Sequence, residues 1–450
     1  MRFALLSALI LMGSAGFAAE PVKDEKPSAT ACTTYGDNFY AVPGSAMCVA
    51  AGAIAELTGQ SSRLSSGAYK QNQLVFHGAL AGDARIDTGA GELRGFARVS
   101  YYSDSHSWTP DYLFVSLTGQ NEASGQIGIT DSTFNYLGGG PAVGTLRSAN
   151  LSAKMIRLTL PVTSGLKFKV SMEIDPQERP RAVADPISRI FPAAIPSITS
   201  NDQWQPDLVA ALSYEPLEGS AQLSGVLHRV QSPRADIPDQ TGFAIQFGVT
   251  LPLNFAPPVA KDDASDDSDD TDSDDSDDDS TDTSDSAQTD RAAKPAKAAK
   301  PYEITHSLAG QIAYARGATL YLGYGTGRFS KAAVDAVVVP GGTLELITGV
   351  TAMGYYAIGW FPTITQNIFA SWSQLNPPSA AVGFNLQGNR AYREGRLGTN
   401  FVYEPVKNFT ITLEAMAMRA DLSGILNGVA TQIGNPTTAY QFSLQVSKVF

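Results

Sequence analysis

Charged side chains recur at alternate positions of several short segments, and this spacing is the clearest chemical signal in the sequence. Asp83, Arg85 and Asp87 are each two residues apart, and Lys167 and Lys169 repeat the spacing. Successive side chains of a β-strand point to opposite faces, so each set lies on one face of its strand. Such a set creates an electrostatic field that attracts, repels and orients ions. Steering of charged solutes is the chemistry that these residues favour.

Covalent catalysis and metal binding are not indicated by any motif. The sequence contains no Gly-x-Ser-x-Gly, no His-Glu-x-x-His and no phosphate-binding loop. Its four histidines are scattered along the chain: His77, His106, His228 and His306. His228 shares the inward parity of Gln222 and Ser224, which favours a lumen-lining imidazole over a lipase-like dyad. No enzyme activity, cofactor or metal site is therefore predicted.

The amino terminus has the layout of a secretory leader. Met1 and Arg2 precede an apolar run over 3–12 and small residues over 13–18, so we expect a signal peptide at 1–18. Export favours a disulfide between the two cysteines, Cys32 and Cys48, with two buried free thiols as the alternative. Such a bridge contributes about 3 kcal/mol in the chain-entropy model and ties together an amino-terminal segment at 19–48.

Alternation of polar and apolar residues continues along the mature chain. Phe442, Leu444 and Val446 alternate with polar residues just before the chain ends at Phe450. The pattern is typical of a wall with lipid on one face and water on the other, and it predicts an all-β fold over 49–450: a transmembrane antiparallel β-barrel of about 16 strands with an aqueous lumen. The predicted strands cover 49–57, 73–87, 93–102, 111–118, 125–132, 151–162, 166–174, 207–214, 220–230, 242–253, 304–315, 344–361, 365–374, 395–403, 409–419 and 439–450.

The predicted connections alternate between short turns and long loops. Turns such as 163–165 and 404–408 contrast with loops such as 133–150 and 175–206. Outer-membrane barrels have this asymmetry, with the short turns in the periplasm. No apolar stretch approaches the ~20 residues of a spanning helix, so we expect an integral protein that crosses the Gram-negative outer membrane as strands. The terminal aromatic residue, Phe450, is expected to act as an assembly signal.

One segment dominates the net charge. Residues 262–290 hold 15 of the 44 acidic residues and no base, which leaves 29 acidic against 32 basic residues elsewhere. Together with the Lys/Pro/Ala-rich stretch behind it, this composition predicts a disordered insertion over 255–303 within the barrel. Strand counting places the insertion on the periplasmic side. It is either a tolerated solvated segment or a weak binder of divalent cations or of a partner.

The stretch from Cys32 to Cys48 resembles the amino-terminal signature of the alphaproteobacterial porin family. Its marks include the Tyr35–Gly36 and Pro43–Gly44 pairs. Four later stretches are similar to family segments in the same order and span most of the mature chain: 206–212, 219–228, 242–252 and 398–405. The resemblance implies a sixteen-stranded general-diffusion porin, a homotrimer in outer-membrane lipid, which conducts small hydrophilic solutes and does not bind nucleic acid.

The family's third outer loop folds into the pore, and 133–150 stands at that place in this sequence. Its glycines at 138–140 tolerate the dihedral angles of a backbone that lies flat against the inner wall, although an ordinary surface turn is an equal alternative. The family usually has an arginine at the position of Ile129 and an acid near Asn135. Both are missing here, so the family's charge pattern at the constriction does not transfer.

Seven charged residues are expected on the inner wall by parity: Asp83, Arg85, Asp87, Arg98, Arg157, Lys167 and Lys169. Arg98 and Arg157 are the ones expected at the narrowest point, in a transverse field against any carboxylate of the loop. The alternative is that all seven are ordinary solvated side chains. Two other functions stay open: a substrate-selective channel, and a structural barrel anchored to the cell wall through its charged insertion.

Overall fold

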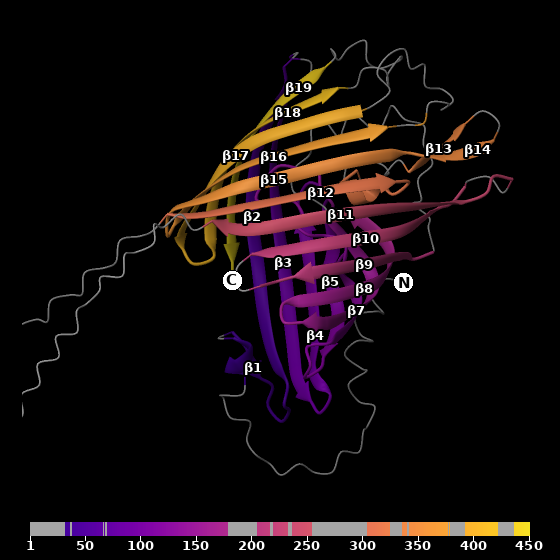
Figure 1. Ribbon diagram of the computed structural model, residues 1–450. Coiled ribbons are helices and arrows are strands. Elements are labelled where there is room, and N and C mark those ends of the chain that lie inside the picture. Colours follow the sequence, from indigo (N-terminus) through magenta and orange to yellow (C-terminus); the bar gives the residue numbers. More distant parts are fainter. Residues whose placement is uncertain are drawn as a thin grey trace, which may run out of the picture.

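The computed structural model describes residues 32–36, 38–65, 67, 70–178, 205–216, 219–232, 236–253, 304–324, 335–339, 342–376, 378, 392–421 and 436–450. The expected leader at 1–18 and the insertion at 255–303 lie outside these ranges. Within them the chain is almost entirely β-structure (Figure 1). No helix of the described residues is long and apolar enough to cross a membrane.

Sixteen long strands form the main sheet, one for each predicted segment. They are β2 (Cys48–Leu64), β3 (Lys70–Thr88), β4 (Gly91–Tyr102), β5 (Ser107–Thr118), β6 (Ser124–Asp131), β7 (Leu151–Thr163), β8 (Leu166–Glu178), β9 (Asp207–Tyr214), β10 (Ser220–Val230), β11 (Gln240–Leu253), β12 (Thr305–Arg316), β15 (Thr348–Phe361), β16 (Ile364–Asn376), β17 (Tyr392–Val406), β18 (Phe409–Asp421) and β19 (Thr437–Val449). Each pairs antiparallel with the next, and β19 pairs with β2 through Leu444 and Gly59, which closes the barrel. In Figure 1 the front wall crosses the back wall, as expected for tilted strands in a closed barrel. The predicted sixteen-stranded barrel is confirmed.

One predicted strand is longer than the strand that is observed. The segment 344–361 is not continuous, because β14 (Thr343–Leu346) pairs with β13 (Ala336–Val339) in a separate hairpin. Ile347 breaks the ladder, since its N–H donates to the carbonyl oxygen of Asp335 at 2.9 Å instead of to a barrel strand. No glycine or proline lies between the two strands, so the sequence carries no turn signal at this change of partner.

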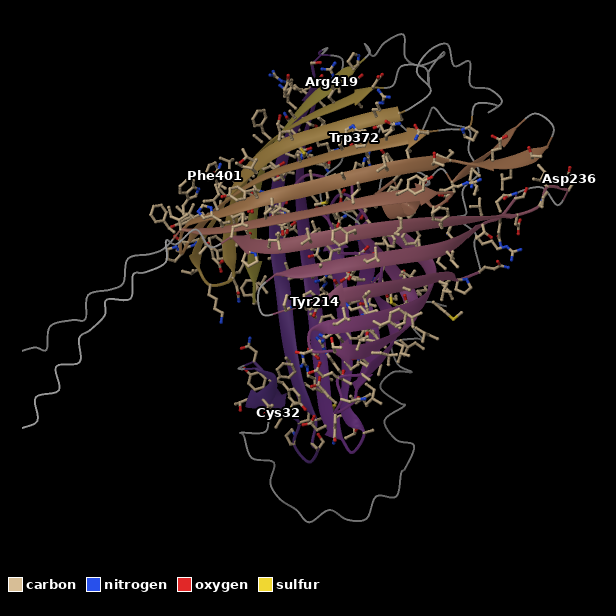
Figure 2. All side chains as sticks on the ribbon, viewed as in Figure 1. Cys32, Tyr214, Asp236, Trp372, Phe401 and Arg419 are labelled. Atoms are coloured by element: carbon tan, nitrogen blue, oxygen red, sulfur yellow. A yellow bond between two sulfur atoms is a disulfide. The ribbon has the colours of Figure 1, made fainter. Side chains whose placement is uncertain are left out.

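The outer face of the barrel is apolar. Aliphatic side chains that alternate with inward residues stay exposed, for example Leu223 (47%), Ile245 (48%) and Leu413 (61%). The aromatic side chains of Trp372 and Phe401 lie on the same surface (Figure 2). An apolar surface of this extent is unfavourable in water and matches the hydrocarbon of a bilayer. The strand pattern thus separates a lipid-facing exterior from a polar interior.

The two ends of the barrel differ in their connections. At one end, tight turns join β3 to β4, β7 to β8 and β17 to β18, and the chain terminates there. The link between β11 and β12 leaves from the same end, since these strands pair up to Leu253 and His306. At the opposite end, the hairpin of β13 and β14 projects from the barrel (Figure 1) and packs against Val230 and Ile237.

A disulfide ties the amino-terminal segment to the first barrel strand. Cys32 and Cys48 are bonded, with Cα atoms 5.6 Å apart, as predicted. Between them lie η3 (Thr33–Tyr35) and β1 (Tyr40–Ala41), and β1 pairs with the start of β2. The rings of Tyr35 and Phe39 lie 5.5 and 5.1 Å from the guanidinium carbon of Arg85 on β3. The segment therefore covers inner-wall residues at the short-turn end.

Candidate functional site

The connection between β6 and β7, residues 132–150, folds into the lumen as an inward loop. Gly138 and Gly140 adopt positive φ angles of 57° and 62°. Glycine takes such angles without strain, so the glycine run shapes the loop. Phe134 and Leu146 are buried, at 0% and 1% exposure, in a cluster with side chains of the barrel wall. Of the two alternatives for this segment, the inward fold is the one observed.

Tyr136 anchors the start of the inward loop to the far wall. Its hydroxyl bonds to the carbonyl oxygen of Ser220 on β10 at 2.9 Å and to Oγ1 of Thr250 on β11 at 3.0 Å. Gly248 makes room for the ring, since a Cβ at that position would lie 2.2 Å from it. The next N–H, of Leu137, donates to Oε1 of Gln311 on β12 at 2.9 Å. The loop therefore spans the lumen rather than resting on its own strands.

Two buried glutamates of the wall accept hydrogen bonds from the loop backbone. Glu414 on β18 accepts from the N–H groups of Val143 at 2.6 Å and Gly144 at 2.8 Å. Glu173 on β8 accepts from the N–H of Thr133 at 2.8 Å. Hydrogen bonds to an ionised carboxylate are about twice as strong as neutral ones. Wall carboxylates thus hold the loop both near its start and near its middle.

Arg147 is the one charged side chain of the inward loop, and it is 4% exposed. Its Nε lies 3.1 Å from both carboxylate oxygens of Glu394 on β17, and its Nη1 donates to the carbonyl oxygen of Gly323 at 3.1 Å. Arg396 and Tyr392 bond to the same carboxylate. The positive charge of the loop is therefore engaged in a buried network and does not face the open lumen.

A second segment, η4 (Thr319–Leu322), also packs inside the barrel. The hydroxyl of Tyr321 donates to Asp207 at 2.7 Å. His228 lies between two carboxylates, with Nδ1 2.8 Å from Asp207 and Nε2 3.6 Å from Asp335. Burial raises the pKa of the Asp335 carboxyl, but the hydrogen bond and charge of His228, together with hydrogen bonds from Thr319, outweigh burial and lower the pKa. His228 has the inward parity of a lumen-lining imidazole, as predicted, but it does not face lumen water: it is 3% exposed and lies between the Asp207 and Asp335 carboxylates.

The inward segments leave polar space along the inner wall of β4 to β8. One cavity of about 400 Å³ lies between the inward loop and this wall, and its lining includes Asn135, Tyr136, Arg157 and Lys169. A second cavity of about 390 Å³ lies on β4 to β7 and includes Arg98 and Arg157 in its lining. Since Arg157 borders both, the two spaces adjoin at this residue.

Three of the seven residues expected on the inner wall border these cavities: Arg98, Arg157 and Lys169. Nε of Arg98 lies 3.3 Å from Oδ2 of Asp111. Arg157 donates to the backbone carbonyl oxygen of Asp131 at 3.4 Å. Parity on β4 and β7 thus brings two arginines from separate strands to one cavity.

Three more of the seven residues lie toward the short-turn end. Asp83 accepts from Arg85 at 3.0 Å and from Arg94 at 2.8 Å, so its charge is shared between two guanidinium groups. Asp87 accepts a hydrogen bond from Tyr35 of the amino-terminal segment. Burial, followed by this bond, raises the pKa of Tyr35 to about 12. These residues form a bonded layer beneath the amino-terminal segment rather than part of either cavity.

The inward loop opposes the basic wall without a carboxylate, because none occurs at 132–150. The expected pairing of wall bases with loop acids is therefore not found there. The wall bases pair instead with acids of the barrel and its turns. Lys167, the last of the seven residues, lies 3.2 Å from Glu215 in the β9–β10 turn. Sequence reasoning assigned no role to Glu394 and Glu414, although the alternation of β17 and β18 places both on the inward face. An acid at an inward position of a strand is the signal that marks them.

Phe450 extends the seam that closes the barrel. Its N–H donates to the carbonyl oxygen of Ala53 at 2.9 Å, and its own carbonyl accepts from the N–H of Ala53 at 3.4 Å. The ring is 68% exposed. The terminal residue thus adds a last rung between β19 and β2.

Solved outer-membrane channels are similar to this chain over nearly its whole length. The channel DcaP of Acinetobacter baumannii is 15% identical, with 89% of this chain and 97% of that chain covered and a TM-score of 0.55. OmpF of Salmonella typhi, solved with daunomycin, is 10% identical, with 90% and 98% covered and a TM-score of 0.52. No family model and no curated protein matches the sequence. The likenesses show the fold, a β-barrel of the outer-membrane channel type.

Proposed function

We propose that this protein is an integral outer-membrane porin, a passive water-filled channel for small hydrophilic solutes and ions. The observation that carries the proposal is the asymmetric filling of the lumen. The inward loop is bonded to the far wall by Tyr136, Arg147 and Glu414, and polar cavities stay open along β4 to β8. A sixteen-stranded barrel is wide enough for an aqueous channel, and a fixed loop narrows such a channel without sealing it.

The finer assignment rests on the sequence. The Cys32 to Cys48 stretch, with its Tyr35–Gly36 and Pro43–Gly44 pairs, supports membership of the alphaproteobacterial porin family and, through it, a homotrimer. The proposal includes a leader at 1–18 that is removed on export, a channel that works without cofactor or chemical reaction, and no role for nucleic acid. Cross-linking of the protein in detergent tests the proposed trimer. The expected product is a species of three times the monomer mass.

Planar-bilayer recording tests the channel. We expect stepwise insertion events with a current proportional to voltage, and a non-zero reversal potential in a salt gradient. Folded protein that inserts without conductance would favour the structural alternative, in which the insertion at 262–301 contacts the cell wall. Co-sedimentation with cell wall, lost on deletion of 262–301, would then be expected.

A substrate-selective channel is the second candidate. It is favoured by the gathering of Arg98 and Arg157 at one cavity opposite a loop that carries no carboxylate. A general-diffusion channel gives a solute flux that rises linearly with concentration, whereas a selective channel gives a flux that saturates. Liposome-swelling rates over a series of neutral and anionic solutes distinguish the two.

A further inference from the structure

The inner wall of β4, β5 and β7 combines arginines with aromatic rings around one cavity. Arg94, Arg98 and Arg157 border this space of about 390 Å³ together with Phe96, Tyr112 and Phe114, and none of the described residues that line it is acidic. The volume falls within the ~300–1,000 Å³ of small-molecule sites. Phenylalanine side chains make no hydrogen bonds with lumen water. A purely aqueous passage therefore does not explain the two phenylalanine rings at this cavity.

The three arginines differ in how far their charge is already satisfied. Arg94 donates to Asp83 through Nε at 3.0 Å and Nη2 at 2.8 Å, a bidentate pair. Arg98 lies beside Asp111, 3.3 Å away. Within the described part of the chain, Arg157 donates to two uncharged oxygens, the side-chain carbonyl of Gln126 and the backbone carbonyl of Asp131. Arg157 is therefore the strongest candidate to bind an anion.

The aromatic rings form one connected surface beside these charges. The centroids of Phe96 and Phe114 are 5.5 Å apart, and those of Phe96 and Tyr112 are 5.9 Å apart in an edge-to-face arrangement. The guanidinium carbon of Arg98 stands 4.4 Å above the Tyr112 ring. Aromatic pairs prefer offset or edge-to-face contacts, which an additional planar ring in the cavity would extend.

We propose that this cavity is a binding site for small aromatic carboxylates. The carboxylate accepts hydrogen bonds from the guanidinium of Arg157, with Arg98 as the second donor, and the ring packs against Phe96 and Phe114. Arginine presents a planar fork that matches a carboxylate, and both halves of the ligand are then satisfied. This inference rests on the proposed channel function and gives that channel a preferred class of solute.

The test measures block of the potassium chloride current by benzoate in planar bilayers. Acetate has the charge without the ring, and benzyl alcohol has the ring without the charge. We expect benzoate to reduce the current in a saturable manner, and each of the two probes to require at least about tenfold higher concentration. Equal block by acetate and benzoate would reduce the site to a simple anion site and overturn the aromatic assignment.

Three variants separate the contributions. Arg157→Gln should weaken benzoate binding about tenfold, equivalent to ~1.4 kcal/mol. Phe96→Leu combined with Phe114→Leu keeps apolar side chains and removes the rings, so benzoate should bind about threefold more weakly while acetate is unaffected. Arg157→Lys keeps the charge without the fork and should weaken benzoate with no change in ion selectivity. Lys154→Gln, which removes a charge from an exposed position of the same strand, is the matched control and should change nothing.

The outcomes also separate this inference from the proposed function. Absence of any current from folded wild-type protein would refute the channel. Normal current that benzoate does not block, or block that survives both Arg157→Gln and the double phenylalanine variant, would refute the binding site alone. A shift in gel mobility on heating, of the same size as in the wild type, shows that each variant has folded.

Discussion

Two arginines of the lumen, Arg147 and Arg157, differ in the groups that they bond to, and this difference gives them different roles. Arg147 meets the carboxylate of Glu394 in a dry network, so its charge serves to hold the inward loop. Arg157 meets uncharged oxygens at the edge of two cavities, so its field extends into water. Similar side chains, one from the loop and one from the strand that follows it, thus have a structural and a solute-directed role.

Replacement of Arg98 and Arg157 with alanine should shift the reversal potential in a salt gradient toward cation preference. The reason is the loss of two positive charges from one cavity wall. Screening limits their reach to about 10 Å at 0.1 M salt, so the shift should shrink as ionic strength rises. A shift of the same size at every salt concentration, or none in dilute salt, would mean that ions pass elsewhere in the lumen.

Replacement of Arg147 with alanine should loosen the inward loop. Removal of one partner from a buried ion pair typically costs about 3–5 kcal/mol, and here Arg396 stays beside Glu394, so the lower end is expected. The measurable result is a larger and noisier single-channel current, with a lower temperature of heat modification. Arg393→Ala, at an exposed position of β17, the strand that carries Glu394, is the control. Unchanged current in the Arg147 variant would assign the hold on the loop to Glu414 and Tyr136.

At the scale of elements, the inward loop and the amino-terminal segment act from different directions on the same lumen. The loop enters from the long-loop end and bonds to the far wall through its backbone and through the side chains of Tyr136 and Arg147. The amino-terminal segment, clamped by the Cys32–Cys48 bond, reaches Arg85 and Asp87 from the short-turn end. Each is held by groups of the barrel wall, so neither needs contacts with the other.

The contact of Tyr35 with Asp87 should respond to alkaline pH. The pKa of Tyr35 in the folded protein is about 12, above the ordinary value of 10.0. A raised pKa contributes stability that is complete below pH 10 and is lost as pH rises through about 12. The difference in phenolate absorbance between the wild type and Tyr35→Phe measures this ionisation. Reduction of the disulfide frees the segment and should move the transition toward pH 10; a transition near 10 in the oxidised protein would contradict the contact.

At the scale of the whole molecule, the closed ladder makes the β11–β12 link separable from the barrel. The two strands pair in register up to Leu253 and His306, on either side of the link. The acidic and Lys/Pro/Ala-rich composition of residues 262–301 provides no apolar core with which to offset an ordering cost of about 1–2 kcal/mol per residue. The link leaves from the short-turn end, which supports a periplasmic position and leaves weak binding of divalent cations as its proposed chemistry.

Replacement of 262–301 with an Asn-Gly turn should therefore preserve a folded, conducting barrel, because such a turn closes an antiparallel hairpin. In the unmodified protein, protease added to intact cells should leave the segment uncut, and permeabilisation of the outer membrane should lead to rapid cleavage. Cleavage in intact cells would place the short-turn end outside. Loss of the heat-modifiable form after the replacement would show that the segment is needed for folding.

Deletion of Phe450 should lower the folded yield in the outer membrane. The residue provides both a backbone rung to Ala53 at the closing seam and the terminal aromatic side chain. Phe450→Ala keeps the rung and removes the ring, so a comparison of the two variants divides the backbone effect from recognition of the aromatic side chain. Equal yields of all three proteins on unheated gels would argue against any role in assembly.

The sequence predicted the barrel far better than its interior. Alternation such as that of Phe442 to Val446 reports burial along one strand, and it located all sixteen strands because each strand has its own lipid-facing side. Contacts such as Arg147 with Glu394 join residues 247 positions apart and depend on where the loop crosses the lumen. Periodicity contains no information on that crossing. The same limit applies to His228, whose parity was correct but whose partner Asp335 comes from a distant part of the sequence.

The division of the wall has a consequence for how such a channel diversifies. Strands β8, β10 to β12, β17 and β18 carry groups that dock the inward loop, whereas β4 to β7 carry the rings and bases that border the second cavity. Substitutions in the second group leave the docking bonds intact. Barrels that descend from one ancestor can thus change the solutes that they conduct through a few substitutions in β4, β5 and β7. The contacts that hold the inward loop in the pore then stay the same.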